Sequence, residues 1–436
     1  MMNTKIKEYS PSAVIGFIGL SHLGLVSSSV LSSLGTRTIC FDSDGTTITK
    51  LKKFITKIDE PGLLDILKSN KSLQTFTSDI NALLDCDLIY ISQDVEIDNK
   101  SLSNLTQIES MITEICNLIR SDIPIVILSQ SIPGFCEQIS NNQKNPIYYQ
   151  VETLVFGEAV KRAKNPERII IGKKSQYENL PACYLEVLEL FKCPVIEMDY
   201  VSAELTKIAI NIYLASDVAI TNSLAEICKI IGGDWNKVIN AIKLDKRIGK
   251  YRYLNPGLGL SGGNIERDLN AITMISSQSG SQNDIFEALM ASSVYYRNWA
   301  IRIVQELGRI NNQIKSFGFW GLSYKPFTNS IRNSPALMTI KCLQQGSKVF
   351  VHDPLVTYVE VQGCDIQQVA DALEMISRID VLLILCPWPD YKDIFDRESI
   401  KILKEKIIID PFFLIDDNLC KEFNIKHYTF YSSRQH

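Results

Sequence analysis

A glycine-rich turn between a strand-like run and a helical pattern is the first segment whose residue types and spacing point to chemistry. Val14–Gly24 reads V-I-G-F-I-G-L-S-H-L-G. Gly19 and Gly24 take the first and third positions of a GxGxxG motif, and Ser21 takes the second. Glycines there permit a tight turn, let a pyrophosphate approach the backbone and let helix and strand pack closely. Ser21 still allows a close turn but its Cβ crowds the phosphate, and a helix is expected to begin near His22.

An acidic residue completes this pattern at the end of the next strand-like run. The carboxylate of Asp42 can accept hydrogen bonds from the adenosine ribose hydroxyls and repels a 2′-phosphate. The pattern therefore favours NAD over NADP. The residues predicted to bind the cofactor are Gly19, Ser21, His22, Leu23, Gly24 and Asp42. The alternative for so degenerate a motif is an ordinary strand–turn–helix with an accidental pair of glycines.

Three further groups of polar residues suit catalysis or anion binding. Lys207 and Asn211 lie one helical turn apart, so they share one face and together can anchor an anionic oxygen or steady a water. Lys325 and Arg332 follow a strand-like run and suit recognition of phosphate or carboxylate. Glu152 also follows a strand-like run, where loops carry function. Without further context, an ordinary solvated surface is the favoured interpretation of each.

A series of motifs then runs in order along almost the whole chain. The segments are Glu60–Leu63 (E-P-G-L), Ser129–Phe135 (S-Q-S-I-P-G-F), Val151–Gly157 (V-E-T-L-V-F-G), Asn165–Gly172 (N-P-E-R-I-I-I-G), Glu204–Asn211 (E-L-T-K-I-A-I-N), Arg247–Gly249, Pro256–Asp268 and Gly321–Pro335. Together they resemble the UDP-glucose/GDP-mannose dehydrogenase family, whose members are nucleotide-sugar 6-dehydrogenases. Each motif alone is weak, and their shared order gives the resemblance its weight.

The resemblance implies an α/β fold with two Rossmann-like parallel-sheet domains joined by a central helical domain. It implies NAD as cofactor, a nucleotide sugar as substrate and a homodimer built on the long central helix, with Arg247 reaching the neighbouring subunit's substrate. The positions that match catalytic residues are Glu152, Lys207, Asn211, Asn264 and Asp268. Ser129 and Arg332 join the cofactor-binding residues. The positions that match substrate-binding residues are Glu152, Lys207, Arg247, Gly259, Gly262 and Lys325.

The glycine-rich loop departs from the family where its chemistry is decided. The family oxidises a sugar's primary alcohol twice, and the cysteine of P-G-x-G-F-G-G-S-C-F-P-K-D forms a thiohemiacetal and then a thioester. This chain has Asn264 at the cysteine position and retains Asp268. An amide cannot replace thiolate chemistry. We therefore expect NAD-dependent oxidation at the C6 hydroxyl of a UDP-glucose-like sugar without a covalent thiohemiacetal.

Three hypotheses remain open at this point. The enzyme stops after one oxidation and releases an aldehyde or ketone, or it completes both through an aldehyde hydrate, with Asp268 and Lys207 activating water and Glu152 assisting. In a different class, the chain is a non-catalytic nucleotide-sugar-binding protein on the dehydrogenase scaffold. The chain retains Glu152, Lys207, Asn211 and Asp268, and this favours an enzyme. Asp410–Phe412 (D-P-F) at the family's D-G-R leaves the substrate's identity open.

Composition bounds the class of protein. The chain has 436 residues, more than one core usually fills, with 45% hydrophobic and 22% charged residues. Its 45 basic and 49 acidic side chains argue against a nucleic-acid partner. The apolar runs are of strand length, so no membrane partner is expected, and the polar Met1–Ser10 is not a secretory signal. Eleven scattered cysteines without a CxxC pair predict no metal site and a reduced, cytoplasmic protein.

The elements that must position these residues follow from periodicity. The expected strands are Ala13–Ile18, Thr38–Phe41, Leu88–Ser92, Ile123–Ser129, Arg168–Ile171, Pro194–Met198, Phe317–Leu322, Lys348–His352, Val381–Cys386 and Lys406–Asp410. Alternation with helical patterns predicts parallel sheets. A long helix is expected over Ser202–Ile231, ended by Gly232. The predicted domains are 1–200 for NAD, 201–308 for dimerisation and 309–436 for the nucleotide sugar.

Overall fold

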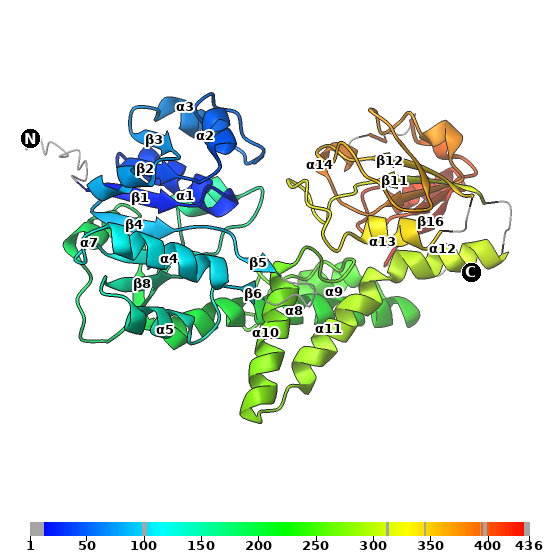
Figure 1. Cartoon of the computed structure of the whole chain (residues 1–436). Coiled ribbons are helices and arrows are strands. Elements are labelled where there is room, and N and C mark those ends of the chain that lie inside the picture. The colour runs from blue at the N-terminus through cyan, green and yellow to red at the C-terminus, as the bar shows by residue number, and fades with distance from the viewer. Residues whose placement is uncertain are drawn as a thin grey trace, which may run out of the picture. The chain divides into compact units, whose positions relative to one another are not determined.

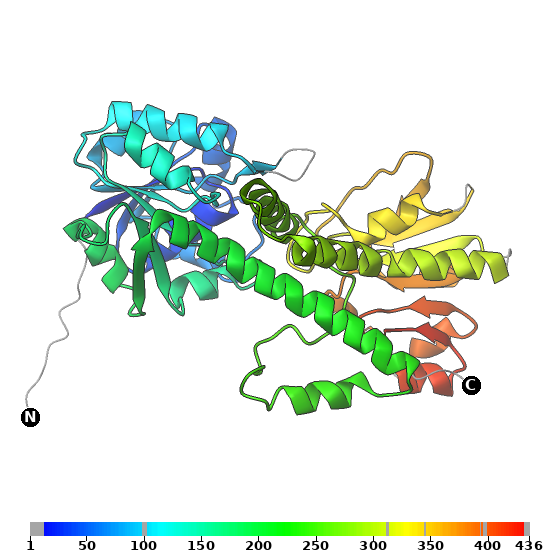
Figure 2. The same cartoon turned by 90° about the horizontal axis from the view of Figure 1, so that it is seen from below.

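The chain divides into two compact units, 1–209 and 210–436. The computed structural model describes residues 13–97, 103–310, 314–343, 346–392, 394–395 and 399–430. Helix α8 (Tyr200–Ile230) begins in the first unit and continues into the second as one unbroken helix (Figure 2). The long helix expected over Ser202–Ile231 is thus confirmed. The three-domain boundaries drawn from the sequence stay predictions.

The first unit is built on an eight-stranded sheet with the order β10-β9-β8-β7-β4-β1-β2-β3 (Figure 1). Its strands are β1 (Val14–Ile18), β2 (Arg37–Phe41), β3 (Gln74–Thr77), β4 (Leu88–Ile91), β7 (Ile125–Ile127), β8 (Ile147–Gln150), β9 (Ile169–Lys173) and β10 (Val195–Asp199). Neighbouring strands are parallel, as expected, except that β8 and β9 pair antiparallel. Strand β1 lies between β2 and β4, so the turn that follows it opens at the carboxyl edge of the sheet.

Helices cover both faces of this sheet. They are α1 (His22–Ser33), α2 (Gly45–Leu51), α3 (Leu63–Ser69), α4 (Thr106–Leu118), α5 (Phe135–Asn142), α6 (Ala159–Lys164) and α7 (Ala182–Glu189), with the 3-10 helix η1 (Ile80–Asp85) and the strand pair β5 (Glu96–Ile97) and β6 (Ser103–Asn104). Side chains alternate along a strand, so Ile89 and Ile91 of β4 face Ile112 of α4. Tyr90, between them, faces Val187 of α7. The sheet therefore has a buried apolar layer on each side.

The second unit contains a six-stranded parallel sheet with the order β13-β12-β11-β14-β15-β16. Its strands are β11 (Ser316–Trp320), β12 (Lys348–His352), β13 (Asp365–Gln368), β14 (Val381–Ile384), β15 (Ile407–Ile409) and β16 (Lys426–Tyr428). Its helices are α9 (Trp235–Ile242), α10 (Asn264–Ser279), α11 (Asp284–Arg297), α12 (Trp299–Ile310), α13 (Pro335–Lys341), α14 (Pro389–Lys392) and α15 (Asp417–Glu422), with the 3-10 helices η2 (Ile376–Arg378) and η3 (Ser399–Leu403). Phe319 faces Ala300 of α12 and Ala336 of α13, whereas Trp320 faces Tyr391 on the opposite side. The expected pair of α/β sheets is confirmed.

Helix α8 is the one described helix with the length and hydropathy to cross a membrane. Its most apolar 18-residue window has a mean hydropathy of 1.3 and is 39% buried. Core helices of soluble proteins meet the same criterion. The part of α8 that belongs to the second unit makes polar contacts within that unit: Asn211 donates to Asp268, Thr221 Oγ1 donates to the Tyr253 carbonyl over 2.7 Å, and Asp217 pairs with Arg252. These contacts are those of a helix packed within a folded domain.

Candidate active site

The turn after β1 has the geometry that the glycine pattern predicts. Gly19 has φ +88°, and a Cβ there would lie 2.7 Å from the Gln93 backbone. A Cβ on Gly24 would lie 1.9 Å from the Gly19 carbonyl oxygen. Asp42 Oδ2 accepts the N–H of Leu20 over 3.0 Å, which places the carboxylate beside the turn at the end of β2. Turn and carboxylate therefore stand together at the sheet edge where a dinucleotide binds in this kind of fold.

Ser21 is accommodated at the second motif position without strain. It precedes α1 with φ −65°, a conformation that needs no glycine, and α1 begins at His22 as expected. The Ser21 hydroxyl donates to the carbonyl of Ser92, at the end of β4, over 3.2 Å. Leu23 packs its side chain against the apolar core, so only its backbone remains for a cofactor. The close turn is therefore kept. Serine in place of glycine reduces the space for the cofactor's phosphates only by the volume of one Cβ and one hydroxyl.

His22 connects this turn to the loop that carries Glu152. Its Nε2 lies 2.7 Å from Oε1 of Glu60, and its ring lies 4.1 Å from that of Phe156. Glu60 is buried and also accepts the backbone N–H groups of Gly157 over 2.8 Å and Ala159 over 3.2 Å. Sequence reasoning did not assign this bridging role. The E-P-G-L motif was the available signal, but nothing in it names partners that lie far along the chain.

Ser129 has a second structural task at the carboxyl edge. Its hydroxyl donates to the carbonyl of Gln93 over 2.6 Å, and the side chain is buried. It thereby ties the segment after β7 to the segment after β4, which borders the dinucleotide turn. Ser129 therefore lies at the carboxyl edge of the sheet, and its hydroxyl already donates a hydrogen bond within the protein.

Glu152 and Lys207 meet within the first unit. Lys207 Nζ donates to the main-chain carbonyl of Glu152 over 2.5 Å, and the backbone N–H of Thr153 donates to the Glu152 carboxylate. Burial raises the pKa of Glu152 above its usual value, while the positive charge of Lys207 opposes that shift. A carboxyl group with a raised pKa beside an ammonium group is suited to accept and return a proton near neutral pH.

Asn211 and Asp268 form the matching pair in the second unit. Asn211 Nδ2 donates to Asp268 Oδ2 over 2.5 Å, and both side chains are buried. Arg267 Nε lies 3.5 Å from the other carboxylate oxygen of Asp268. Asn264 is the first residue of α10, is exposed, and stands one turn before Asp268 on the same face. The position that departs from the family pattern therefore adjoins the retained carboxylate.

A buried ion pair in this loop was missed from the sequence. Glu266, at the family's proline position, pairs with Arg297 of α11 over 2.6 Å and accepts from the side-chain amide of Asn333. Glu266 and Arg297 are both buried. The pairing joins the start of α10 to α11 and to the segment after β11, because its partners come from both. No local pattern marks Glu266, since Arg297 lies 31 positions further along the chain.

The remaining predicted residues lie around the glycine-rich loop of the second unit. Arg332 packs on this loop: its carbonyl accepts the N–H of Gly262 over 3.2 Å, and a Cβ on Gly263 would lie 2.9 Å from its Nε. Gly259 lets the loop approach α11, since a Cβ there would lie 2.4 Å from the Ser293 carbonyl oxygen. Gly262 packs beneath the ring of Tyr324. These glycines therefore have a packing reason independent of any ligand.

Two basic residues stand outside that packing. Lys325 Nζ lies 5.7 Å from the Tyr324 ring, and the residue is half-buried. The Arg247 side chain is 88% exposed and forms a paired contact with Asp245, with Nη2 2.6 Å from Oδ2. Arg247 thus projects from its own chain, as a residue that reaches elsewhere must.

The eleven cysteines are all free thiols, and six are buried. Cys228, the closest in sequence to Asn264, packs in an apolar cluster with Trp235 and Ile239. Burial raises the pKa of Cys136 well above its usual value and that of Cys86 to about 12. Buried thiols with raised pKa values are poor nucleophiles. Within the described part of the chain, no group of three or more His, Cys, Asp or Glu side chains could hold a metal ion.

Three family models match consecutive parts of the chain. They are the NAD binding domain (residues 13–192), the central domain (201–293) and the UDP binding domain (318–417) of the UDP-glucose/GDP-mannose dehydrogenase family. A curated relative, UDP-glucose 6-dehydrogenase TuaD of Bacillus subtilis, is 30% identical over 413 residues, covering 91% of this chain and 88% of its own. The chain belongs to the UDP-glucose/GDP-mannose dehydrogenase family.

Family membership makes this protein an NAD-dependent nucleotide-sugar dehydrogenase. The UDP-glucose 6-dehydrogenase of Rickettsia conorii is 27% identical over 431 residues, covering 95% of this chain and 98% of its own. Among solved structures, a UDP-glucose dehydrogenase from Pyrobaculum islandicum superposes with a TM-score of 0.85 at 23% identity, covering 97% of this chain and 99% of that one. A UDP-D-ManNAc dehydrogenase from Pyrococcus horikoshii gives a TM-score of 0.81 at 19% identity, covering 95% and 98%. At these identities the structural matches speak for the fold alone.

Proposed function

We propose that this dehydrogenase oxidises the C6 hydroxyl of a UDP-glucose-like nucleotide sugar without forming a covalent thiohemiacetal. The observation that carries the proposal is Asn264 at the first position of α10, one turn before the buried Asp268–Asn211 pair. The nucleophile is replaced while the carboxylate and amide beside it are kept. The relatives named for UDP-glucose support the substrate class.

The dinucleotide turn fits NAD, because Gly19 and Gly24 allow the tight turn and the close strand–helix packing of this motif, and the Asp42 carboxylate lies beside the turn. Bound NAD supplies the hydride acceptor for oxidation of the C6 carbon. The chain's own groups handle the protons and the water. Glu152, whose pKa is raised by burial, accepts the proton of the C6 hydroxyl in the first oxidation.

A second oxidation needs no thiol if the aldehyde is hydrated. Water adds to the C6 carbonyl, its proton goes to the carboxylate of Asp268, and the ammonium group of Lys207 stabilises the oxygen that gains charge. The Asp268 carboxyl group then returns the proton to the new alkoxide, which completes a gem-diol with a C–H and an O–H. Its two-electron oxidation to the carboxylic acid would use a second molecule of NAD as the hydride acceptor. Asn211 donates to Asp268 over 2.5 Å and so holds that carboxylate in one orientation.

The test counts the NADH formed per sugar consumed. The protein is incubated with NAD and with UDP-, GDP- and dTDP-linked sugars, and reactions are quenched for intact-mass analysis. A ratio of two without an acyl adduct on the protein supports the hydrate route, and a ratio of one supports release of the aldehyde or ketone. An acyl adduct on a cysteine would overturn the non-covalent proposal. Tight sugar binding without NADH formation would overturn the proposed oxidation of that sugar.

Substitution of Asn264 by Cys tests whether this position alone sets the chemistry. If the wild type gives one NADH per sugar, Asn264→Cys should raise the ratio towards two and yield a thioester adduct on quenching, because the remaining site is intact. Asn264→Ser introduces a hydroxyl group, which is a much weaker nucleophile than a thiolate. It is the matched control and should leave the number of NADH per sugar unchanged. An unchanged ratio in both variants means that other parts of the site also limit the second step.

We also propose a homodimer formed through α8. The second-unit part of this helix exposes an apolar stripe with helical spacing, consisting of Tyr213, Ile220, Leu224, Ile227 and Ile231, the last just past the helix end. Exposed fractions range from 47% at Leu224 to 77% at Ile231, which is unusual for large apolar side chains at such spacing. A second copy of the chain is the partner with a complementary stripe. Arg247, exposed on its own chain, would then reach the neighbouring substrate.

A further inference from the structure

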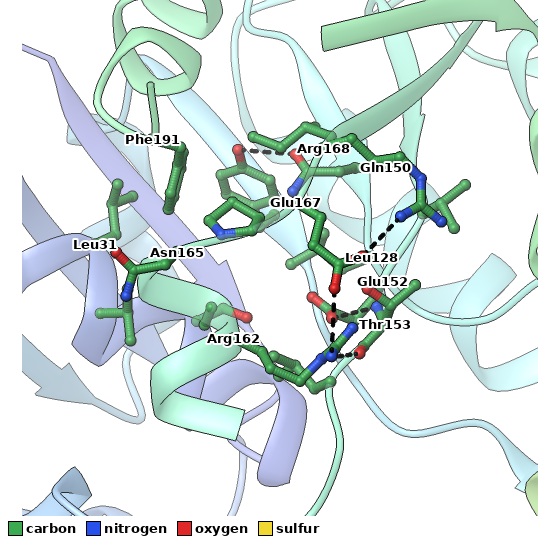
Figure 3. Close-up of a pocket in the computed structure, with 18 of the residues that line it drawn as sticks. Leu31, Leu128, Gln150, Glu152, Thr153, Arg162, Asn165, Glu167, Arg168 and Phe191 are labelled. Carbon is green, nitrogen blue, oxygen red and sulfur yellow. Dashed lines mark hydrogen bonds and ion pairs between the residues drawn. The ribbon is translucent and has the colours of Figure 1, made fainter. Parts of the chain in front are cut away.

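The first unit contains a cavity that extends from the loop of Glu152 into the space under the sheet, away from the dinucleotide turn. Its volume is about 410 Å³, and it lies between one face of the sheet and helices α1, α6 and α7. Of the residues predicted to bind NAD, none lines it. Figure 3 shows Leu31 and Phe191 towards one side and Glu152 and Thr153 towards the other. The volume is within the usual range of small-molecule sites, ~300–1,000 Å³.

The wall formed by the sheet is aromatic and apolar. Phe17 of β1 and Tyr90 of β4 stack with their ring centroids 4.9 Å apart and their planes 15° apart. Leu31 of α1 and Leu128, just after β7, complete this wall, and all four side chains are buried. Because the two rings are stacked on each other, the wall is an aromatic pair flanked by apolar side chains. A planar, mostly apolar molecule can pack against it with favourable burial and ring contacts.

One interior side chain has hydrogen-bonding capacity left over. Gln150 Oε1 accepts the hydroxyls of Tyr184 over 2.9 Å and Tyr90 over 3.4 Å. Its Nε2 donates to no group in the part of the chain that the structure describes, so the amide N–H groups are available to an acceptor in the cavity. The phenols fix the amide's orientation, since the oxygen must face them.

A guanidinium group stands at the mouth of the cavity. Arg162 Nε donates to the Thr153 carbonyl over 3.1 Å, and its Nη1 lies 3.9 Å from Glu167 Oε1. The Glu167 side chain is 69% exposed, so this pair is solvent-screened and worth little. The second guanidinium edge of Arg162 can therefore take a stronger anionic partner in a bidentate contact.

We propose that this cavity binds a small, planar, mostly apolar molecule with one carboxylate group. The ring lies on Phe17 and Tyr90, and the carboxylate binds Arg162, with Gln150 donating to a polar atom on the ring or to the carboxylate. The proposed ligand is an effector rather than a substrate. Nothing in the cavity resembles the pattern for a pyrophosphate.

The cavity shares a loop with the catalytic candidates. Glu152 and Thr153 line it, and the Thr153 carbonyl is the acceptor for Arg162. The same loop gives its Glu152 carbonyl to Lys207. A ligand whose carboxylate attracts Arg162 would weaken the hydrogen bond from Arg162 to the Thr153 carbonyl. The neighbouring Glu152 would then shift. The effect on turnover rests on the proposed function, whereas binding itself does not.

The test uses 2-naphthoate as the probe and isothermal titration calorimetry on the full chain, with NAD at saturation. Wild type should bind one equivalent, and NAD should not displace it. Ser27→Phe, which places a ring into the cavity from α1, should weaken binding at least ~10-fold, and Arg162→Gln should weaken it ~5-fold or more. Arg120→Gln removes an exposed guanidinium paired with Asp122 elsewhere in the first unit and is the matched control, with a change below ~2-fold.

Amide hydrogen exchange gives a readout that is independent of activity. Binding of 2-naphthoate should slow exchange over residues 152–158 in wild type and in Arg120→Gln, but not in Ser27→Phe. Displacement of the probe by NAD, equal affinity in all variants, or no binding at ~5 mM would each overturn the proposed site. A chain that binds the probe yet forms no NADH would keep the site and refute the enzyme proposal, so the two failures are distinct.

Discussion

At the residue scale, Asn264 stands where the motif comparison predicts a cysteine, one helical turn before the buried carboxylate of Asp268. Asn264 cannot form a thiohemiacetal, but the Asp268 carboxylate one turn away is buried and oriented by Asn211. Glu266, at the start of α10, pairs with Arg297 at the end of α11. A loop that had merely lost its function would be expected to keep solvent-exposed replacements rather than a buried, mutually satisfied pair of charges. The buried pair of Glu266 and Arg297 therefore gives this loop a packing arrangement of its own.

The buried carboxyl group of Glu152 allows a test of how its charge affects stability and activity. Burial raises its pKa, so its protonated form favours folding and that contribution is lost as pH rises through the raised pKa. Glu152→Gln imitates the protonated form. It should raise the Tm by ~2–4 °C at pH 8, leave it unchanged at pH 4, and lower kcat ~100-fold or more.

Calorimetry at the two pH values and the initial rate of NADH formation check this prediction. Glu158→Gln, an exposed carboxylate in the same segment, is the control and should change neither quantity. A Tm gain of equal size at both pH values would show that charge is not the cause. Full activity in Glu152→Gln would remove this residue from the proposed proton transfer.

How far residue types foretell a site depends on how local the contacts are. Gly19, Gly24 and Asp42 stand where their pattern placed them, because strand, turn and helix are local. The roles of Glu60 and Glu266 were not visible. The partners of Glu60 at Gly157 and Ala159 lie 97 and 99 positions away, so only the folded chain brings them together.

At the element scale, most central strands and the edge strand β10 were predicted, whereas the central strand β8 and the edge strands β3, β13 and β16 were not. Strands β4, β11 and β14 are buried on both faces and read as continuous apolar runs. Strands β3, β13 and β16 lie at sheet edges, and sequences such as Q-T-F-T and D-I-Q-Q carry little apolar signal. The antiparallel pairing of β8 with β9 likewise could not be predicted from the residues of the two strands, because the direction of a strand depends on the path of the segment that connects them.

Glu204 of α8 fastens that helix to the segment after β7. Its carboxylate accepts the N–H of Gly134 over 2.7 Å, the N–H of Cys136 over 2.9 Å and the hydroxyl of Ser131 over 3.1 Å, and it is fully buried. In Glu204→Gln, the side-chain NH2 group replaces one accepting oxygen and faces an N–H or O–H group that has then lost its acceptor. It should lower the free energy of unfolding of the first unit by ~1–3 kcal/mol, measured by urea titration. Glu189→Gln, exposed on α7, should change it by less than ~0.5 kcal/mol. Equal stability of the two variants would contradict the capping role.

His427 of β16 links the end of β15 to α15. Its Nδ1 lies 3.2 Å from Asp417 and its Nε2 lies 3.6 Å from Asp410, an ion-pair separation rather than a hydrogen bond. Burial lowers the pKa of His427, but the interaction with Asp410 outweighs it and raises the pKa to about 10. The protonated ring therefore stabilises the fold fully below its unfolded pKa of ~6.5, and that contribution is lost as pH rises towards 10.

The expected outcome is a second unit that loses stability between pH 7 and pH 10. His427→Gln should be less stable than wild type at pH 6 and should show a flatter decline across this range, because the titrating group is gone. Differential scanning calorimetry at unit pH steps measures both. His352→Gln is the control, since burial lowers the pKa of that ring and it is neutral throughout the range. A wild-type Tm that rises from pH 7 to pH 10 would contradict the assigned pairing.

At the scale of the whole molecule, the order of the motifs along the chain predicted the family, and three family models match consecutive parts of the chain in the same order. Assembly is a different matter. The apolar pattern of α8 covers more than one face, so the sequence indicated burial on several sides without saying what buries it. The structure resolves this in part, because Leu269 and Leu289 of the same unit pack with Ala215 while the stripe from Tyr213 to Ile231 faces outward.

That stripe carries the prediction at this scale. Ile220→Glu with Leu224→Glu places two charges in the centre of the proposed interface, where a second copy would have to bury them unpaired. Sedimentation velocity should show a dimer for wild type and a monomer for the double variant, and turnover should fall because Arg247 no longer reaches a neighbouring substrate. Leu64→Glu, an exposed apolar residue on α3 away from the stripe, should remain dimeric and active. A dimeric double variant would place the interface elsewhere, and a fully active monomer would separate Arg247 from the reaction.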